Sequence, residues 1–409
     1  MNAWQIEHQC PQCGAPVLLD ETDRLLDCKF CRTRLFLTAP EGFRYVLPPP
    51  ADTTARELLF LPYWRLKGTS YDCRSSGIVS RFVDTSTLAL NATGLPRSLG
   101  VRPQAMKLKF RAAGQAGRFL EPGVPCREVV RTAAAQAAGG DGPQEFIGET
   151  VSLIHTPVYF DKNALCDAIL KRPLPLPADR AGALAALLDA PAHPTAAVRF
   201  LPAQCPRCGW DLEGERDSLV LTCRNCQSAW AGRDDGWEEV AFRVLPTAAA
   251  PVFYLPFWRM QARLDGLEMR TFADLIRFAN LPRVVTPAFA AAPVHFWSPA
   301  FKINPAQFLR WARQLTAAQP DGEGAAKFPE ASRHPVTLPL SEAGESIRVT
   351  LANLVPNKRQ ALPLLKEIRV TVEEARLIYH PFLVGRSELL HERLRLTLDR
   401  AALAYGSQL

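Results

Sequence analysis

The cysteines carry the most specific chemical signal in this chain of 409 residues. Eight of the 11 cysteines form Cys-x-x-Cys pairs, which are grouped into two clusters with fourteen residues between the pairs of each cluster. A Cys-x-x-Cys turn presents two thiolates on one side, so two such turns can close a tetrahedral shell around a soft metal ion. The predicted ligands are Cys10, Cys13, Cys28 and Cys31 in the first cluster and Cys205, Cys208, Cys223 and Cys226 in the second.

Four cysteines per site leave no position open to water or substrate, which indicates structural rather than catalytic metal sites. We expect two structural Zn2+ ions per chain. Iron bound by four thiolates is compatible with the same spacing. A redox dithiol is the other alternative, although the βαβ context of a thioredoxin-like motif is missing. The remaining cysteines, Cys73, Cys126 and Cys166, are expected to be small buried residues.

The clusters lie 195 residues apart, and further motifs recur in the same order. A Leu-Pro-aromatic-Trp-Arg motif at 61–65 returns at 255–259, and the segment 149–160 matches 373–384. Leu-Pro-Arg occurs at 95–97 and again at 281–283. A tandem duplication explains this pattern. The second copy then has an insertion around 320–372.

These motifs predict an α+β fold in which each four-cysteine zinc ribbon precedes a β-rich domain with short helices. Within the first ribbon, 17–19 and 24–26 read as a hairpin and 35–37 as a third strand. Helices are expected to begin at Pro125 and Pro305. Other expected elements are a short helix at 163–170, a helix near 183–188, and strands at 346–351 and 368–372. The segment 389–398 is expected to form a strand or an edge helix. The predicted domains are ribbon 1 at 1–47, β-rich domain 1 at 48–170, a Pro/Ala linker at 171–198, ribbon 2 at 199–245 and β-rich domain 2 at 246–409.

The motifs CPQCG…CKFC and CPRCG…CRNC resemble the zinc-ribbon superfamily, which includes ribbons of transcription factors and RNA polymerase subunits. The chain is also similar to uncharacterised bacterial proteins that begin with a zinc ribbon and continue into a β-rich region. Each Cys-x-x-Cys turn with the residue that follows it is called a knuckle. The second knuckle of each cluster departs from the family pattern, because Arg32 and Gln227 stand where glycine is frequent. The resemblance covers the ribbons alone. It implies metal binding and recognition of protein or nucleic acid, without implying an enzymatic activity.

Basic residues interleaved with aromatic residues suggest a recognition surface beyond the ribbons. The stretches 97–118 and 277–313 contain several basic residues and no acidic ones. Single-stranded nucleic acid would suit such a surface, as would an acidic protein or anionic lipid. In the competing interpretation, the aromatic residues form the core of each domain beneath a solvated charged face. The candidate partner-binding residues are Trp64, Arg65, Arg97, Arg102, Lys107, Lys109, Trp258, Arg259, Arg283, Lys302 and Arg310.

The composition is that of a folded protein, with 47% hydrophobic and 22% charged residues and a formal charge of +7. There is no apolar run near the ~20 residues of a membrane span and no recognisable signal peptide. Paired cysteines suit a reducing compartment, so we expect a cytoplasmic protein. The histidines are isolated, and phosphate-loop, nucleophile-elbow and metalloprotease motifs are missing.

We therefore expect a non-enzymatic adaptor or scaffold that holds another macromolecule, and a protein is the expected partner. A nucleic-acid-binding protein that uses 97–118 and 277–313 is the alternative. An enzyme with an unrecognised site ranks third, and a small-molecule substrate is not expected.

Overall fold

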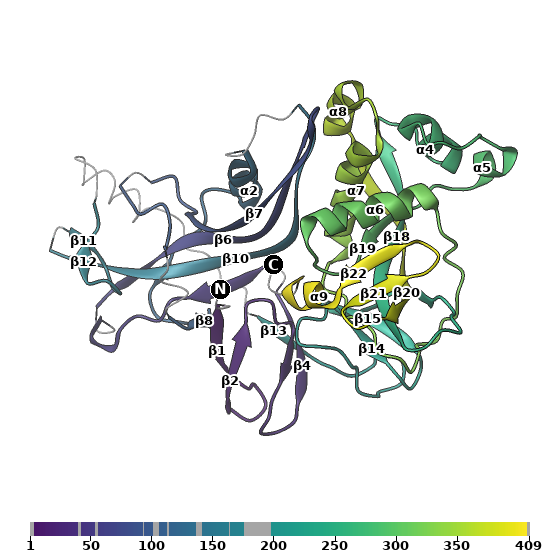
Figure 1. Ribbon diagram of the computed structural model, residues 1–409. Coiled ribbons are helices and arrows are strands. Elements are labelled where there is room, and N and C mark those ends of the chain that lie inside the picture. Colours follow the sequence, from purple (N-terminus) through teal and green to yellow (C-terminus); the bar gives the residue numbers. More distant parts are fainter. Residues whose placement is uncertain are drawn as a thin grey trace.

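The computed structural model describes residues 4–39, 42–53, 56–92, 94–100, 106–112, 114–135, 141–162, 164–175 and 198–406. Strands predominate over helices in this part of the chain, in agreement with a β-rich α+β fold. The strands of these described ranges form four sheets. Figure 1 shows the N-terminal half, in purple and blue, beside the C-terminal half, in green and yellow. The helix expected near 183–188 lies outside the described residues.

The largest sheet is built on two long antiparallel strands, β6 (Leu58–Arg74) and β10 (Gln144–Asp161). Nearly all of β6 is buried, because β10 and β7 flank it. The main strand order is β12-β11-β10-β5-β8-β1-β2, and β6 also pairs with β7 and β9. The shorter strands are β1 (Gln5–Gln9), β2 (Pro16–Asp20), β5 (Phe43–Val46), β7 (Gly77–Leu88), β8 (Leu108–Phe110), β9 (Arg118–Phe119), β11 (Ala164–Asp167) and β12 (Arg172–Pro173). Strands from 1–47 and 48–170 thus share one sheet.

The strands around the cysteine clusters form two small sheets. The first joins β3 (Leu25–Asp27), β4 (Arg34–Thr38) and β13 (Arg199–Pro202), so it contains strands from both predicted ribbons. The second contains β14 (Val220–Cys223), β15 (Ser228–Arg233) and β16 (Gly236–Glu239).

The hairpin expected over 17–26 is wrong, although both of its strands exist. β2 pairs with β1, and β3 pairs with β4. Leu19 lies opposite Ile6 and both are buried in the core of the first half. Leu25 lies opposite Phe36, and both pack against residues of the second cysteine cluster. Burial in two different cores therefore separates the two strands.

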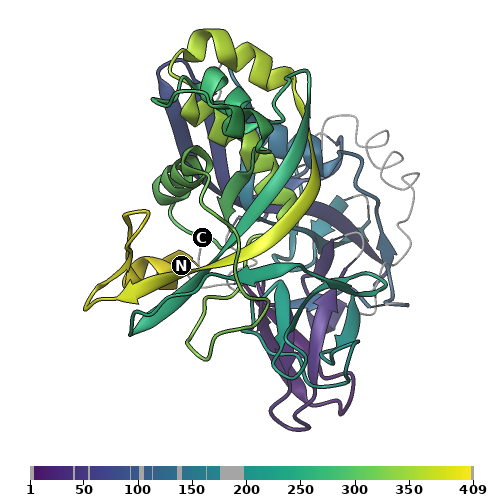
Figure 2. The same ribbon diagram turned by 90° about the vertical axis from the view of Figure 1, so that its right-hand side faces the viewer.

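The second half contains a corresponding pair of long strands, β18 (Val252–Asp265) and β20 (Arg369–Val384), which Figure 2 shows side by side. Pro62 lies opposite His155 in the first half, and Pro256 lies opposite Tyr379 in the second. Each strand pair has a register shift at the corresponding place. The other strands of this sheet are β17 (Phe242–Val244), β19 (Phe296–Pro299), β21 (Glu388–His391) and β22 (Leu396–Asp399). β17 runs parallel to β20 as β5 runs parallel to β10.

The helices expected at the two prolines are present, as α2 (Cys126–Ala135) and α6 (Pro305–Ala318). The strand expected at 346–351 is wrong, because this segment lies inside α7 (Leu340–Leu354). Its buried residues include Ala343, Ile347 and Leu351, a helical spacing that outweighs the local β-branched pattern. The remaining helices are η1 (Ala51–Thr53), α4 (Phe272–Ala279), α5 (Pro287–Ala291), α8 (Lys358–Glu367) and α9 (Arg400–Gly406).

Two other local expectations have different outcomes. The short helix expected at 163–170 is wrong, because Lys162 has a φ of 53° and the chain returns along β10 as β11. The strand expected at 368–372 is confirmed as the start of β20. The segment 389–398 forms most of the β21–β22 hairpin.

The two halves contact each other through α7 of the second half and the long strands of the first. The amide N–H of Gly148 donates to the Glu342 carboxylate, and Arg348 forms an ion pair with Glu145. These contacts place charged side chains of α7 directly against β10.

Candidate metal centres

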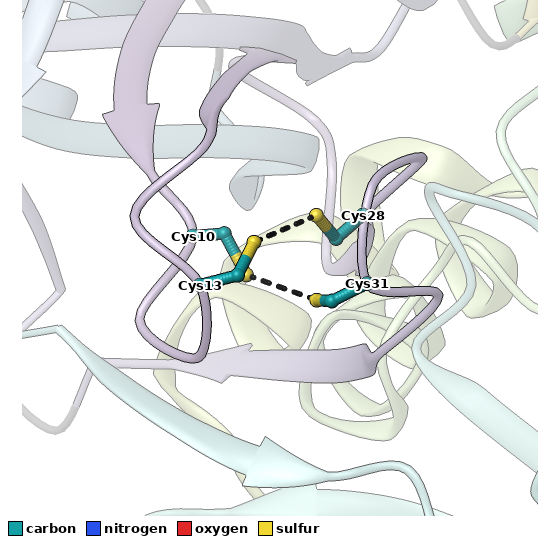
Figure 3. Close-up of side chains that lie close together, drawn as sticks. All are labelled: Cys10, Cys13, Cys28 and Cys31. Carbon is teal, nitrogen blue, oxygen red and sulfur yellow. Dashed lines mark hydrogen bonds between the residues drawn. The ribbon is translucent and has the colours of Figure 1, made fainter.

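Each predicted set of four cysteines converges in space. In the first set, Cys10 Sγ lies 3.7 Å from Cys31 Sγ, and Cys13 Sγ lies 3.7 Å from Cys28 Sγ (Figure 3). The two corresponding distances in the second set are 3.5 Å. All four sulfurs of a set lie within 4.8 Å of one another. A tetrahedron with metal–sulfur bonds of about 2.3 Å has sulfur–sulfur edges of about 3.8 Å, so either set could hold a metal ion.

The turns that present these thiolates have a common backbone geometry. The amide N–H of Gly14 donates to Cys10 O at 2.8 Å, that of Arg32 to Cys28 O at 2.8 Å, and that of Gly209 to Cys205 O at 2.8 Å. The residue after each pair of cysteines has a positive φ, which is 73° at Gly14 and 72° at Gly209. Glycine reaches this left-handed conformation at little cost.

Arg32 and Gln227 adopt the same conformation without being glycine, with φ values of 60° and 54°. Gln227 has a side-chain reason to be there, because its Oε1 accepts from the amide N–H of Phe328 at 2.7 Å and its Nε2 donates to Arg224 O at 2.6 Å. The departure from the glycine pattern at Gln227 therefore links the second metal centre to the loop that contains Phe328.

Polar groups next to two of the sulfurs favour the thiolate form that a metal requires, whereas burial raises the pKa of Cys223 to about 12. Hydrogen bonding to Thr33 lowers the pKa of Cys31 to about 6. Hydrogen bonds from Asn225 and from the backbone of Trp210 lower the pKa of Cys208 to about 6. Ser228 Oγ is 3.0 Å from Cys226 Sγ, although burial outweighs this contact and raises the pKa of Cys226.

Both centres are partly embedded in the protein. Cys10 and Cys28 are buried against Leu19, Leu26 and Leu35 of the first core, whereas Cys13 is exposed. The second set has the same order of burial, with its first and third cysteines buried. A metal ion would therefore connect the exposed tip of each knuckle to a hydrophobic core.

The two knuckle regions also contact each other. Arg34 Nη1 donates to Leu212 O at 2.9 Å, and the amide N–H of Leu25 donates to Arg216 O at 2.9 Å. The ring of Phe36 lies so close to Gly232 that a Cβ on this glycine would be 2.2 Å from a ring carbon. Gly232 is thus required by close packing between the two regions.

Several of the predicted partner-binding residues belong to the interior. Arg65 and Trp258 are fully buried, so their assignment to an exposed surface is corrected. Arg65 forms ion pairs with Glu21 and Asp84, and the indole of Trp258 donates to Leu338 O at 3.0 Å.

Three others are half-buried. The indole of Trp64 donates to Val124 O at 2.8 Å. Arg259 Nη2 lies 3.3 Å from His295 Nδ1, and Lys302 Nζ lies 3.4 Å from Thr150 Oγ1 at the junction of the halves. The competing interpretation, in which the repeated aromatic motifs build the core, therefore describes Trp64 and Trp258 better.

The remaining candidates that the structure describes are exposed, namely Arg97, Lys107, Lys109, Arg283 and Arg310. Arg102 lies outside the described residues. Lys107 and Lys109 line a groove of about 770 Å³, and the lining of this groove includes no residue from 277–313. The structure therefore does not bring the two basic stretches together in this groove.

Sequence reasoning missed several notable residues. Phe30 and Trp210 are 71% and 58% exposed beside metal-ligand cysteines. Their position close to these cysteines in the sequence could have predicted this exposure. The buried His380 Nδ1 lies 3.1 Å from His391 Nε2, and no sequence motif predicts this contact between β20 and β21.

None of the helices in the described residues has the length and apolar character that a membrane crossing requires. Comparisons of the chain with protein-family models, with curated proteins and with solved structures find no match.

Proposed function

We propose that each cysteine set binds one structural zinc ion. Four thiolates complete the shell of a tetrahedral ion, and sulfur–sulfur distances of 3.5 and 3.7 Å suit that geometry. Elemental analysis of the purified protein should find two equivalents of zinc for the two sites. Visible absorbance with equimolar iron would overturn the assignment to zinc, and the absence of any metal would overturn the metal sites themselves.

We further propose that the chain is a tandem duplication of a zinc ribbon followed by a β-rich domain. The supporting observation is the register of the long strands, in which Pro62 faces His155 and Pro256 faces Tyr379. These four positions correspond in the repeated sequence motifs. Shared cross-strand register at matching positions is difficult to produce by chance, because a slip of one residue reverses every side chain.

The function that we propose is that of a non-enzymatic adaptor that holds another protein. The observation that carries it is the exposure of Phe30 and Trp210 on turns that the metal centres hold in place. Aromatic residues are enriched in protein interfaces, where a rigid ring buries a large area at small entropic cost. The proposal of a non-enzymatic role is also supported by the four-cysteine sites, because a metal ion with four protein ligands has no free position for a substrate.

Capture of partners from native cells tests this function. Zinc-loaded wild-type protein should retain a specific protein, and a Phe30→Ser/Trp210→Ser double variant should lose it. Val284→Ser is the control, because Val284 is 84% exposed and lies far from the knuckles in sequence. Equal retention by the double variant and wild type would count against the role of the knuckles.

Nucleic acid is the second candidate partner. It is supported by the exposed basic residues Arg97, Lys107, Lys109, Arg283 and Arg310. Binding through phosphates should weaken steeply as salt rises. Titration with a labelled oligonucleotide at two salt concentrations measures this directly, and affinity that is insensitive to salt would exclude the basic residues as the binding surface.

A further inference from the structure

A groove of about 770 Å³ lies where three distant parts of the chain meet. One wall comes from β1 and β2 of the first cysteine region, and another from β8. The segment that leads into β13, including Val198 and Phe200, completes it. The groove is separate from both metal centres, because no ligand cysteine lines it.

Part of the lining is basic. Lys107, which directly precedes β8, and Lys109 within it alternate with the buried residues Leu108 and Phe110, and both lysines are exposed. Lys107 Nζ forms an ion pair with Glu7 Oε1 at 2.8 Å. Lys109 lies opposite Glu7 in the pairing of β8 with β1, and its charge helps to lower the pKa of the Glu7 carboxyl after the larger effect of Lys107. Within the described residues Lys109 forms no direct ion pair.

The lining also contains apolar residues. Leu18 is 41% exposed, and Val17 and Val198 are further members of the lining. Leu18 and Lys109 flank Glu7 in the sheet, one on each side of it. With Lys107 and Lys109 against the single Glu7, this lining is suited to a ligand that carries both apolar and acidic groups.

The edge of the sheet at this groove is closed to an added strand. β2 is the last strand of the sheet. Pro16 has no amide N–H to offer, and Leu18 O already accepts from Arg216 Nη2 at 3.0 Å. A ligand must therefore be held through side chains rather than by extension of the sheet.

The aromatic residues of the groove pack against each other instead of presenting open faces. The ring of His8 stacks on Phe200 with centroids 5.1 Å apart and an interplanar angle of 7°. The edge of Phe110 closes the neighbouring side at 5.2 Å. Single-stranded nucleic acid binds through free aromatic faces on which bases stack, so this groove suits a polypeptide better.

We propose that the groove binds an acidic segment of a partner protein that also carries apolar side chains. Its carboxylates pair with Lys109 and compete with Glu7 for Lys107, and an apolar side chain packs on Leu18. This inference rests on the proposed adaptor function and names the chemistry of the segment that the adaptor recognises.

Fluorescence anisotropy on the full-length, zinc-loaded protein tests the proposal. The probe is a labelled peptide of alternating Asp and Leu, compared with a Lys and Leu peptide and with an oligothymidine of similar length. Lys109→Glu and Leu18→Asp should each weaken binding of the acidic peptide by about tenfold or more, because they reverse or introduce charge at the contact. Arg386→Glu is the matched control, since Arg386 is exposed between β20 and β21 and does not line the groove.

The outcomes separate clearly when the zinc content of every variant matches that of the wild type. Selective loss in the two groove variants supports the proposal. Equal binding of all variants, tighter binding of the basic peptide, or displacement of the peptide by oligothymidine overturns it. If the groove variants still capture a partner from cells, the groove proposal fails while the adaptor proposal stands. If the Phe30→Ser/Trp210→Ser variant captures the partner as well as the wild type does, the adaptor proposal fails.

Discussion

Arg65 and Arg259 occupy the same position of the repeated Leu-Pro-aromatic-Trp-Arg motif, yet the structure predicts that they differ greatly in their contribution to stability. Arg65 Nη1 lies 2.7 Å from Asp84 Oδ1, and its Nη2 lies 3.2 Å from Glu21 Oε1. Its guanidinium also stacks over Trp4 with 3.9 Å between Cζ and the ring centroid. The side chains of Arg65 and Glu21 are 1% and 3% exposed, so the pair is shielded from water.

Replacing Arg65 with methionine keeps the side-chain volume and removes the charge. Among the described residues, Lys67 would remain as the ion-pair partner of Glu21, with its Nζ 3.7 Å from Glu21 Oε1. Removing one partner of a buried ion pair costs about 3–5 kcal/mol, because the remaining charge stays buried without compensation. The Lys67 contact places the expected cost for Arg65→Met at the lower end, about 3 kcal/mol.

Arg259→Met is the matched control. Arg259 is half-buried, and its polar contact is with His295 Nδ1 at 3.3 Å. Loss of one such hydrogen bond costs about 1 kcal/mol. Urea unfolding of the zinc-loaded proteins, followed by tryptophan fluorescence, measures both free energies of unfolding. Equal costs for the two variants, or a cost for Arg65→Met near that of the control, would refute the argument.

A second substitution isolates the electrostatic part. Adding Glu21→Gln to Arg65→Met removes the uncompensated carboxylate, so the double variant should be more stable than the sum of the single effects predicts. Contacting residues of one network show coupling energies of about 0.5–3 kcal/mol. Strict additivity of the two substitutions would show that Arg65 contributes through packing on Trp4 instead.

Three further predictions concern the knuckles, the buried histidines and the metal. Arg32→Gly should leave stability unchanged or raise it by up to about 1 kcal/mol, because glycine favours the left-handed conformation. Gln227→Gly has the same backbone benefit but loses two side-chain hydrogen bonds, one accepted from Phe328 N and one donated to Arg224 O. At about 1 kcal/mol for each bond, stability should fall by a net of about 1 kcal/mol; thermal melts of both variants check this, and a gain in the second would contradict it. Burial lowers the pKa of His391 to about 4 from its ordinary value of 6.5, so the unfolded state binds more protons in this range and stability falls as pH drops from 6.5 towards 4. Urea unfolding across that range should show a contribution to the slope of up to about 1.4 kcal/mol per pH unit from this residue, and His391→Gln should reduce the slope by that contribution. The slope that remains comes from groups such as His295, whose pKa burial also lowers to about 4. Chelation of zinc should lower the melting temperature and expose the core around Cys10 and Cys28 to hydrophobic dyes; an unchanged melting curve after complete metal removal would contradict a structural role.

The cysteine sets were predictable because their chemistry depends on short-range spacing. A Cys-x-x-Cys turn fixes the positions of two sulfurs locally, so a single contact between two such turns completes the set of four ligands. The positive φ of the residue after each turn is also a local property. At Arg32 and Gln227 it cannot be predicted from the residue type, because neither residue is glycine. Helices beginning at Pro125 and Pro305 follow from the same kind of local information.

Strand partners and the roles of individual charged residues were not predictable in this way. The pattern around 17–26 specifies two strands, but burial against different cores sends β2 to β1 and β3 to β4. Arg65 resembles an exposed recognition residue in the sequence, and only the approach of Glu21 and Asp84 from other segments makes it a buried ion-pair partner.

The sequence by itself determined the two sets of thiolate ligands, the repeated order of motifs and the predominance of strands, because each depends on neighbouring residues or on periodicity along the chain. The tertiary structure alone decided the shared sheet of β4 and β13, the buried His380–His391 pair and the groove bounded by Leu18, Lys109 and Phe200. The sheet and the groove join residues that are far apart in sequence, whereas the two histidines, 11 residues apart, meet through the pairing of β20 with β21. Their proximity arises from burial of apolar surface across the whole fold, which no short segment encodes.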